Sequence, residues 1–255
     1  MKIGIIGPCE DEVIPFIGEM ERVTVEDRAK LRFYAGKYAS LDIVALFCGV
    51  CKVNAAIAAQ LLIDRYNVTH IIVTGVAGAI DPALHIYDTV VASEVAYHDV
   101  ADEILTDYHP WMESAWFRAD GEMLEGILRA NAGDQSVFTG KMVTGEAFID
   151  QHGREEIISK FNPQCVDMET AAVAHVCYAN GTPFAAIRSM SDTPHESGND
   201  AFEKYAGSAA EKSIAVMKRY LNTLSRKCAI DSLFHPEQSE GSSDSTLRSN
   251  DKSYD

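Results

Sequence analysis

The fold of this chain is decided by Gln164-Cys165-Val166-Asp167-Met168-Glu169-Thr170-Ala171-Ala172-Val173-Ala174-His175-Val176, in which a short apolar run meets a long series of small residues. The run that ends at Asp167 predicts a strand, and the series that begins at Glu169 predicts a buried helix. A strand that passes directly into a helix is the repeating unit of α/β folds, so the stretch indicates that fold class.

Glu169 stands where this helix begins. The backbone N–H groups at a helix start are unpaired and carry the positive end of the helix dipole, which favours an ionised carboxylate. Such a carboxylate is a strong hydrogen-bond acceptor, suited to the hydroxyl groups of a sugar. The alternative is an acid that only helps the helix to begin, and the stretch alone does not separate the two.

Strands and helices alternate along the rest of the chain. Apolar runs predict strands at 2–7, 31–39, 41–47, 70–74, 89–97, 137–143 and 184–190. Helical periodicity predicts helices near 13–17 and at 53–65, 120–130, 153–161 and 201–224. About seven or eight strands and six helices fit a single three-layer α/β domain with a mostly parallel sheet covered on both faces.

Composition excludes several kinds of partner. The chain has 255 residues, 47% of them hydrophobic and 24% charged, and a formal net charge of -16. This charge repels nucleic acids and anionic membranes. No apolar run approaches the roughly 18 residues of a membrane span, and the first residues lack the features of a secretory signal. We expect a cytoplasmic protein with neither nucleic acid nor membrane as partner.

The character of the sequence changes near Ser225, after which serine, acidic residues and glycine dominate. Such a segment buries too little apolar surface to offset the entropy lost on ordering. We therefore expect residues 1–224 to form the folded domain and residues 225–255 to be a mostly disordered polar tail without a catalytic role.

Two further segments have alternative interpretations. Cys48 and Cys51 have the CxxC spacing of a redox pair between a strand-like and a helix-like run. Because the fold around them is much larger than a thioredoxin unit, we favour buried apolar packing. Residues 101–118 predict a long surface excursion, which is typical of a lid or a subunit contact.

Acids, glycines and an aromatic follow the predicted strands. Ligands of parallel sheets bind beyond the carboxyl ends of the strands, so these residues are candidates for one site. They are Glu12, Ala77 and Gly78 in a glycine turn at 75–79, Phe148, Met168 with Glu169, and Asp192. Three acids around an aromatic ring fit hydrolysis of a purine N-glycoside, in which one carboxylate activates water and a protonated acid assists the leaving group. We expect neither a cofactor nor a metal.

Five segments carry a resemblance to a known family. They are Met1-Lys2-Ile3-Gly4-Ile5-Ile6-Gly7 with Glu10-Asp11-Glu12, Thr74-Gly75-Val76-Ala77-Gly78, Thr144-Gly145-Glu146-Ala147-Phe148-Ile149, Val166-Asp167-Met168-Glu169-Thr170-Ala171-Ala172, and Arg188-Ser189-Met190-Ser191-Asp192. In this order the chain resembles the bacterial 5'-methylthioadenosine/S-adenosylhomocysteine nucleosidases over residues 1 to about 224.

The resemblance implies a homodimer with the nucleoside phosphorylase fold, a three-layer α/β/α sandwich with a mixed central sheet. It implies that Glu12 activates the attacking water and that Asp192 protonates N7 of adenine. Glu169 would hold the ribose hydroxyls, with Met168 packed against the sugar and Phe148 stacked on the base.

The same resemblance assigns the remaining walls of the pocket. The backbone of Ile149 would read the edge of the base, and Ala77 and Gly78 would line the ribose and base pocket. Phe202 would close over the site, and part of 97–117 would reach the pocket of the neighbouring subunit. Asp167 stands where the family commonly has glutamate, and this shorter side chain argues against a direct sugar contact.

The proposed chemistry requires different surroundings for the acids. Burial should raise the pKa of Asp192 so that it carries a proton, whereas Glu12 and Glu169 should be ionised. Plain structural alternatives remain: Glu12 as a first-turn acid, Asp192 as a turn or capping residue and Phe148 as core. Arg188 could be a buried partner of Glu12 or Glu169.

The expected reaction is hydrolysis of 5'-methylthioadenosine and S-adenosylhomocysteine to adenine and a 5-thio-substituted ribose. Alternatives are a phosphorolytic enzyme of the same fold, an aminodeoxyfutalosine nucleosidase, and a nucleoside-binding sensor without turnover. An ionised Glu12 would repel a phosphate dianion, and binding alone needs neither a water activator nor an acid. We therefore favour hydrolysis over phosphorolysis and over sensing; the sequence does not separate aminodeoxyfutalosine from the other substrates.

Overall fold

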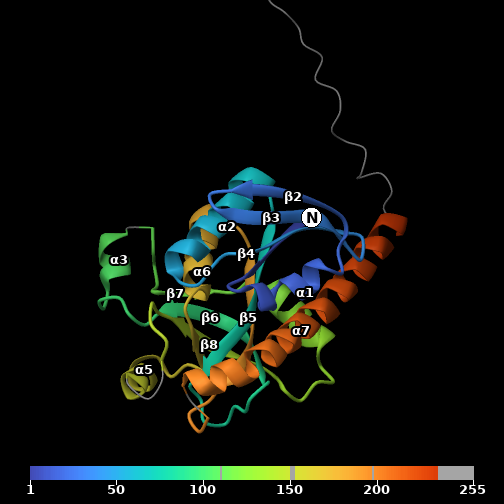
Figure 1. Cartoon of the computed structure of the whole chain (residues 1–255). Coiled ribbons are helices and arrows are strands. Elements are labelled where there is room, and N and C mark those ends of the chain that lie inside the picture. The colour runs from blue at the N-terminus through green and yellow to red at the C-terminus, as the bar shows by residue number, and fades with distance from the viewer. Residues whose placement is uncertain (110, 150–152, 197, 235–255) are drawn as a thin grey trace, which may run out of the picture.

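The structure is a computed structural model that describes residues 1–109, 111–149, 153–196 and 198–234 (Figure 1). Its strands are β1 (Lys2–Gly7), β2 (Glu21–Arg28), β3 (Leu31–Tyr38), β4 (Leu41–Phe47), β5 (His70–Ala79), β6 (Thr89–Tyr97), β7 (Trp116–Arg118), β8 (Val137–Thr144), β9 (Cys165–Asp167) and β10 (Phe184–Asp192). Its helices are the 3-10 turn η1 (Glu10–Glu12), α1 (Ile14–Ile17), α2 (Lys52–Tyr66), α3 (Ile104–Tyr108), α4 (Gly121–Ala130), α5 (Arg154–Phe161), α6 (Thr170–Asn180) and α7 (Asn199–Phe234).

The strands form one mixed sheet in the order β10-β6-β8-β9-β5-β1-β4-β3-β2, with β7 beside β6. Helices α2 and α6 pack on one face, where Leu62 and Val173 are fully buried. Helices α1, α4 and α7 pack on the other face, where Phe16, Ile127 and Met217 are fully buried (Figure 1). The expected three-layer α/β/α sandwich with a mixed central sheet is confirmed.

The central strands are apolar along their length because both faces are covered. Every residue of β10 is buried, and Ile71 to Val73 of β5 have no exposed surface. Strand β10 runs parallel to β5, with Arg188 opposite Gly75 and Asp192 opposite Gly78. This register brings an arginine and an acid of one strand beside the glycines of the next.

Two predictions about the strands are wrong. The glycine turn at 75–79 does not exist, because β5 continues to Ala79 and pairs with β10 and β9 there. Within the described residues the sheet has ten strands, more than the sequence predicts. Strand β2 escapes detection because almost all of it is exposed at the edge of the sheet and therefore lacks an apolar pattern facing the core.

The segment 101–118 is not entirely a surface excursion. It contains α3 and β7, and β7 pairs with β6. Met112 and Phe117 are buried in the core, whereas Tyr108 and Trp111 are exposed. Of the aromatic residues in this segment, Phe117 thus packs in the core, whereas Tyr108 and Trp111 lie on the surface.

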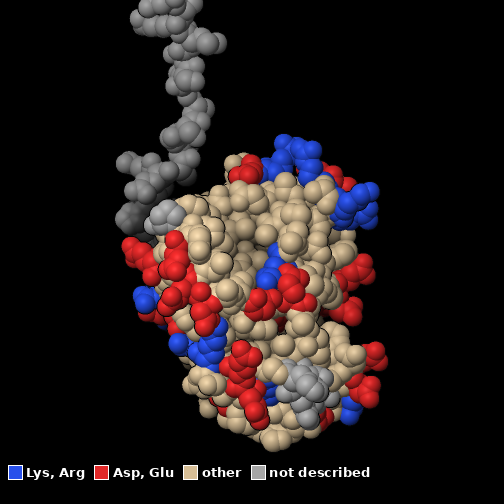
Figure 2. Space-filling view, turned by 90° about the vertical axis from the view of Figure 1, so that its left-hand side faces the viewer, with Lys and Arg blue, Asp and Glu red and all other residues tan. Residues whose placement is uncertain are grey.

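Helix α7 continues beyond the predicted domain boundary at Leu224 and includes Phe234, the last described residue. The remaining part of the expected tail, 235–255, lies outside the described residues. Among the helices that the structure describes, none combines the length and the apolar character needed to cross a membrane. On the face drawn in Figure 2, acidic side chains occupy more surface than basic ones, in line with the net charge of -16.

Candidate active site

One cavity at the edge of the sheet contains all the candidate site residues. Its lining includes Glu12, Ala77, Gly78, Phe148, Ile149, Met168, Glu169, Asp192 and Phe202. These residues come from η1, β5, the segment after β8, the segment between β9 and α6, the end of β10 and the start of α7. The convergence follows from the sheet order, because β5 lies next to β1, β9 and β10.

Glu12 is almost fully buried, with 4% of its surface exposed. Its Oε1 accepts a hydrogen bond from the Val76 N–H at 2.7 Å, and its Oε2 accepts one from the Cys9 N–H at 2.6 Å. Burial raises the pKa of Glu12, while Arg188 and these two N–H groups oppose the rise. The carboxylate is therefore held in a fixed position in surroundings that increase its affinity for a proton.

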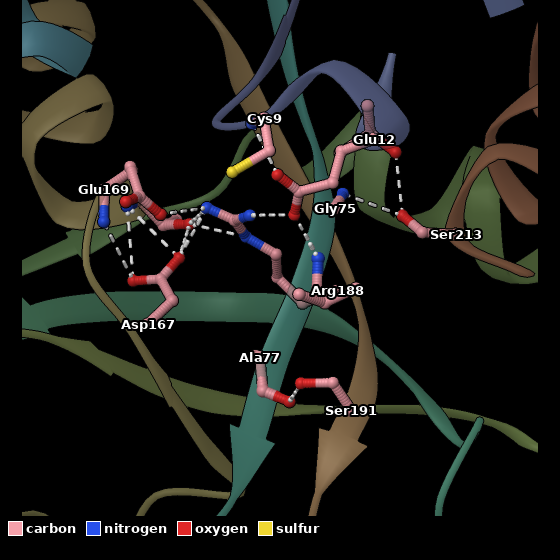
Figure 3. A network of polar contacts seen from close by, with 12 residues as sticks. Cys9, Glu12, Gly75, Ala77, Asp167, Glu169, Arg188, Ser191 and Ser213 are labelled. Carbon is pink, nitrogen blue, oxygen red and sulfur yellow. Dashed lines mark hydrogen bonds and ion pairs between the residues drawn. The ribbon is translucent and has the colours of Figure 1, made fainter. Parts of the chain in front are cut away.

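Arg188 lies between Glu12 on one side and Asp167 and Glu169 on the other (Figure 3). Its Nη2 is 2.7 Å from Asp167 Oδ2 and 3.2 Å from Glu169 Oε2. Its Nη1 is 3.7 Å from Glu12 Oε1 and makes no hydrogen bond. Arg188 is thus a partner of both glutamates that the sequence suggested, and of Asp167 as well.

The absence of a side chain at Gly75 allows Glu12 and Arg188 to approach each other. This glycine has a φ of +144°, and a Cβ added there would lie 2.2 Å from Glu12 Oε1 and 2.6 Å from Arg188 Nη1. A side chain at this position would therefore collide with both charged groups. The glycines of β5 provide space for the site rather than a turn.

Asp167 fixes the other side of the arginine. Its Oδ1 accepts a hydrogen bond from Thr144 Oγ1 at 2.5 Å, and its carboxylate also accepts from the N–H and hydroxyl of Thr170. The Thr170 hydroxyl in turn accepts from Arg188 Nε at 3.2 Å. Asp167 is therefore occupied by contacts within the protein, which agrees with the expectation that it does not bind the sugar directly.

Glu169 precedes the first residue of α6, but its side chain makes no capping hydrogen bond to that helix. Instead, its Oε1 accepts from the Cys51 N–H at 2.9 Å, where α2 begins. Burial raises the pKa of Glu169 to about 7, with Arg188 opposing the rise and Asp167 adding to it. The expectation that its own helix keeps Glu169 ionised is wrong, because the carboxylate lies at the start of a different helix and is largely desolvated.

Asp192 ends β10 and has 1% of its surface exposed. Its Oδ1 accepts from Ser191 Oγ at 3.1 Å, and its Oδ2 is buried without a hydrogen-bond partner. Gly78 makes room for it, since an added Cβ there would lie 2.9 Å from Oδ2. Burial raises the pKa of Asp192 to about 6, as the sequence predicts, with Ser191 and Arg154 opposing the rise.

Two aromatic rings form an apolar wall of the cavity. Phe148 and Phe202 meet edge to face with their centroids 6.2 Å apart. Phe148 is 41% exposed, so it is not a core residue. The segment that carries it is held by Asp99, which accepts from the Glu146 N–H at 2.8 Å and pairs with Lys52 Nζ at 2.8 Å.

The cysteines show no sign of redox chemistry in their surroundings. Cys48 and Cys51 are both free thiols, and Cys48 is buried in the core. Burial raises the pKa of Cys48 and of Cys51, which disfavours the reactive thiolate. In the described parts of the chain, no group of His, Cys, Asp or Glu side chains has the arrangement of a metal site.

Three contributions to the site are missing from the sequence prediction. The ion pair of Arg188 with Asp167 is not predicted there, because the sequence suggests only Glu12 or Glu169 as partners of this arginine. The space-making role of Gly75 depends on the approach of Glu12, which only the fold provides. Ser213 of α7, whose hydroxyl accepts from the Gly75 N–H at 3.0 Å, has no signal in its local sequence.

Gly75→Ala tests the close approach at β5. We expect this variant to lose about 1–3 kcal/mol of unfolding free energy in urea, because the added methyl group overpacks a charged, buried region. Gly207→Ala in α7 is the control: no atom lies within 4 Å of its added Cβ, so helix propensity predicts no loss. Equal stability of Gly75→Ala and the wild type would contradict the geometry.

Asp192→Asn tests the buried acid. The folded pKa of about 6 exceeds the ordinary value of 3.8, so the wild type loses stability as the pH rises through this window. The penalty is on the order of 3 kcal/mol above that window, and a neutral asparagine avoids it. Thermal unfolding should show Asp192→Asn more stable than wild type at neutral pH, with a smaller difference at pH values near 4. A variant less stable than wild type at every pH would refute the assignment.

Comparison with known proteins identifies the family. A family model described as the phosphorylase superfamily matches residues 2–222. The chain is 37% identical to the 5'-methylthioadenosine/S-adenosylhomocysteine nucleosidase of Exiguobacterium sp. over 232 residues, which are 86% of this chain and 98% of that relative. The structure of the nucleosidase of the same name from Colwellia psychrerythraea 34H, in complex with adenine, is similar with a TM-score of 0.80 and 31% identity, covering 88% of this chain and 96% of that one.

A futalosine hydrolase of Helicobacter pylori strain 26695 has a TM-score of 0.79 over 88% of this chain and 98% of its own, but at 24% identity it shows the fold alone. The nucleosidase relatives, in contrast, share sequence as well as fold along almost their whole length. The resemblance seen in the sequence is therefore confirmed, and the chain belongs to the 5'-methylthioadenosine/S-adenosylhomocysteine nucleosidase family within the phosphorylase superfamily.

Proposed function

We propose that this protein hydrolyses the N-glycosidic bond of 5'-methylthioadenosine and S-adenosylhomocysteine, releasing adenine and the 5-thio-substituted ribose. The observation that carries the proposal is the meeting of Glu12, Glu169 and Asp192 in one cavity, each in different electrostatic surroundings. The names of the relatives support the substrate class.

Asp192 is the general acid. A carboxyl group with a pKa of about 6 keeps a proton on a fraction of molecules at neutral pH, and that fraction has enough acidity to release it. Its unpartnered Oδ2 lies in the wall of the cavity, where a base nitrogen would satisfy it. Asp192 donates this proton to N7 of adenine as the C1'–N9 bond breaks.

Glu12 is the general base. Its carboxylate is fixed by the Val76 and Cys9 N–H groups and lies 3.7 Å from an Arg188 Nη1 that makes no hydrogen bond. A water in the cavity, hydrogen-bonded to Glu12, would donate a proton to this carboxylate and place its oxygen towards the sugar. The water oxygen then bonds to C1' while its proton passes to Glu12.

The sugar and the base are held by the remaining candidates. Glu169 accepts hydrogen bonds from the ribose hydroxyls, and its pKa of about 7 falls when these donors stabilise the ionised form. Met168 packs against the sugar, and Phe148 stacks on adenine with Phe202 closing the wall. Ala77, Gly78 and the backbone of Ile149 line the base pocket.

Water rather than phosphate suits this cavity. Glu12, Asp167 and Glu169 surround Arg188, so the local charge is unfavourable for a phosphate dianion. A phosphorolytic enzyme needs cations in excess at the position of the nucleophile. The arrangement therefore favours a neutral nucleophile.

The direct test is to incubate the purified protein with methylthioadenosine, with and without inorganic phosphate, and to identify the products. We expect adenine and free methylthioribose under both conditions. A sugar 1-phosphate that forms only with phosphate would establish phosphorolysis instead. Tight binding of the nucleoside without release of adenine would establish a sensor.

Glu12→Gln should lower the rate of adenine release by about 10²- to 10⁴-fold, because the general base is lost, while adenine still binds in calorimetry. Glu10→Gln is the matched control, since Glu10 is an exposed acid in the same η1 turn and should leave the rate unchanged. Equal rates for Glu12→Gln and wild type would remove Glu12 from the mechanism.

We also propose that the protein is a homodimer. The chain exposes large apolar side chains, including Val53 and Ile57 of α2, Tyr108 of α3, Tyr178 of α6 and Trp111 in the segment between α3 and β7. A second copy of the chain would remove this surface from water. Light scattering should give twice the mass of the 27.9 kDa chain, and the mass of one chain would contradict the proposal.

The assignment of the catalytic domain and of the C-terminal segment stays a prediction. We propose that the catalytic domain is contained in residues 1–224, since the lining residues of the cavity all precede Leu224. Residues 225–255 then take no part in the chemistry. The cytoplasmic location also stays a prediction from the sequence.

A further inference from the structure

Helix α7 carries a polar residue at its contact with the sheet that the chemistry above does not use. Ser213 has no exposed surface and does not line the cavity. Its Oγ lies 3.0 Å from the Gly75 N, 2.9 Å from the Ile187 O and 2.7 Å from Thr74 Oγ1. A buried hydroxyl with three close partners indicates a specific role in holding the backbone.

The partners determine the direction of each hydrogen bond. A serine hydroxyl has one proton, and the Ile187 carbonyl can only accept it. The Gly75 N–H can only donate, so Ser213 accepts this hydrogen bond. Because the single proton of Ser213 is used on Ile187, the Thr74 hydroxyl must also donate to Ser213. Ser213 therefore uses its full hydrogen-bonding capacity on two neighbouring strands.

The contacts of Ser213 lie at the point of β5 where its pairing with β1 stops. Strand β1 pairs with β5 only as far as Val73, and Thr74 and Gly75 follow. On β10, Ile187 is the register partner of Thr74, and Arg188 is the partner of Gly75. Ser213 thus holds the two strands directly before the residues that contact Glu12.

The position of Glu12 depends on this piece of backbone. Its Oε1 accepts from the Val76 N–H at 2.7 Å, and Gly75 lies so close that an added Cβ would be 2.2 Å from the same oxygen. In Figure 3, Gly75 lies between the Ser213 hydroxyl and the Glu12 carboxylate. Arg188 approaches the same carboxylate from the side away from Ser213. A small movement of Gly75 would therefore change the contacts of both Glu12 and Arg188.

We propose that Ser213 is a positioning residue, which fixes the Gly75–Val76 backbone and through it the Glu12 carboxylate and the Arg188 guanidinium. It acts from outside the cavity and touches no reacting atom. The effect on turnover rests on the proposed function, because it requires Glu12 to be the general base.

The test compares Ser213→Ala with Ser189→Ala. Ser189 is also a fully buried serine, and its hydroxyl pairs with Thr89 Oγ1 at 2.8 Å between β10 and β6. Both variants lose a buried hydroxyl contact, but only Ser213→Ala releases Gly75. We expect Ser213→Ala to lower kcat at least about tenfold with KM changed less than about threefold, and Ser189→Ala to keep both near wild type.

The pH profile separates positioning from general loss of stability. The charged and titratable groups that face Glu12 are Arg188 of β10, Glu169 at the start of α6, and the thiols of Cys9 and Cys48. Weaker contacts from Val76 and Arg188 would remove influences that lower the pKa of Glu12, so the acidic limb of kcat/KM should move to higher pH in Ser213→Ala only.

Amide hydrogen exchange provides a readout that does not depend on activity. Residues 74–76 should exchange faster in Ser213→Ala than in wild type or Ser189→Ala. If Ser213→Ala does not fold, Ser213→Cys, with a weaker donor of similar size, carries the same comparison. Identical kcat, pH profile and exchange in the Ser213 and Ser189 variants would overturn the proposal. A wild type that releases no adenine would instead overturn the proposed function, and the exchange comparison would still decide the role of Ser213.

Discussion

The ionic contact between the buried Arg188 and three carboxylates is the constraint on which the rest of the site depends. A fully buried guanidinium is costly unless its partners are near and well oriented, so Glu12, Asp167 and Glu169 must converge on it. They come from elements far apart in the chain, and only the sheet order brings them together. The requirement to pair this buried cation thus brings together the acids that face the cavity.

The carboxyl groups differ because their partners differ. Asp167 is occupied by Arg188, Thr144 and Thr170, which holds it in the wall. Glu169 shares Arg188 but faces the cavity, and its pKa rises to about 7 through burial. Asp192 has no such ion pair with Arg188 and keeps one oxygen without a partner, so burial dominates its titration. One region of the fold therefore offers both an acid and acceptors at neutral pH.

Much of this organisation could be predicted from the sequence. Apolar runs located the central strands, and the rule that ligands bind beyond strand ends selected residues that the structure brings to one cavity, among them Glu12 and Asp192. The exposed edge strand β2 was not predictable, since it lacks the apolar pattern of a buried face. The continuation of β5 through its glycines was also missed, because glycine usually interrupts a strand. Contacts such as Glu169 with the Cys51 N–H or Ser213 with Gly75 join residues distant in sequence, and no local pattern records them.

The proposed mechanism requires Glu12, Glu169 and Asp192 to act on one adenine nucleoside in this cavity. The most direct measurement is a crystal structure of the protein with a non-hydrolysable analogue of methylthioadenosine. We expect Asp192 within roughly 3 Å of the atom at the N7 position, Glu169 at hydrogen-bonding distance from the ribose hydroxyls, and an ordered water at Glu12. A nucleoside bound elsewhere, or bound here with its base away from Asp192 and its sugar away from Glu12, would rule out this mechanism.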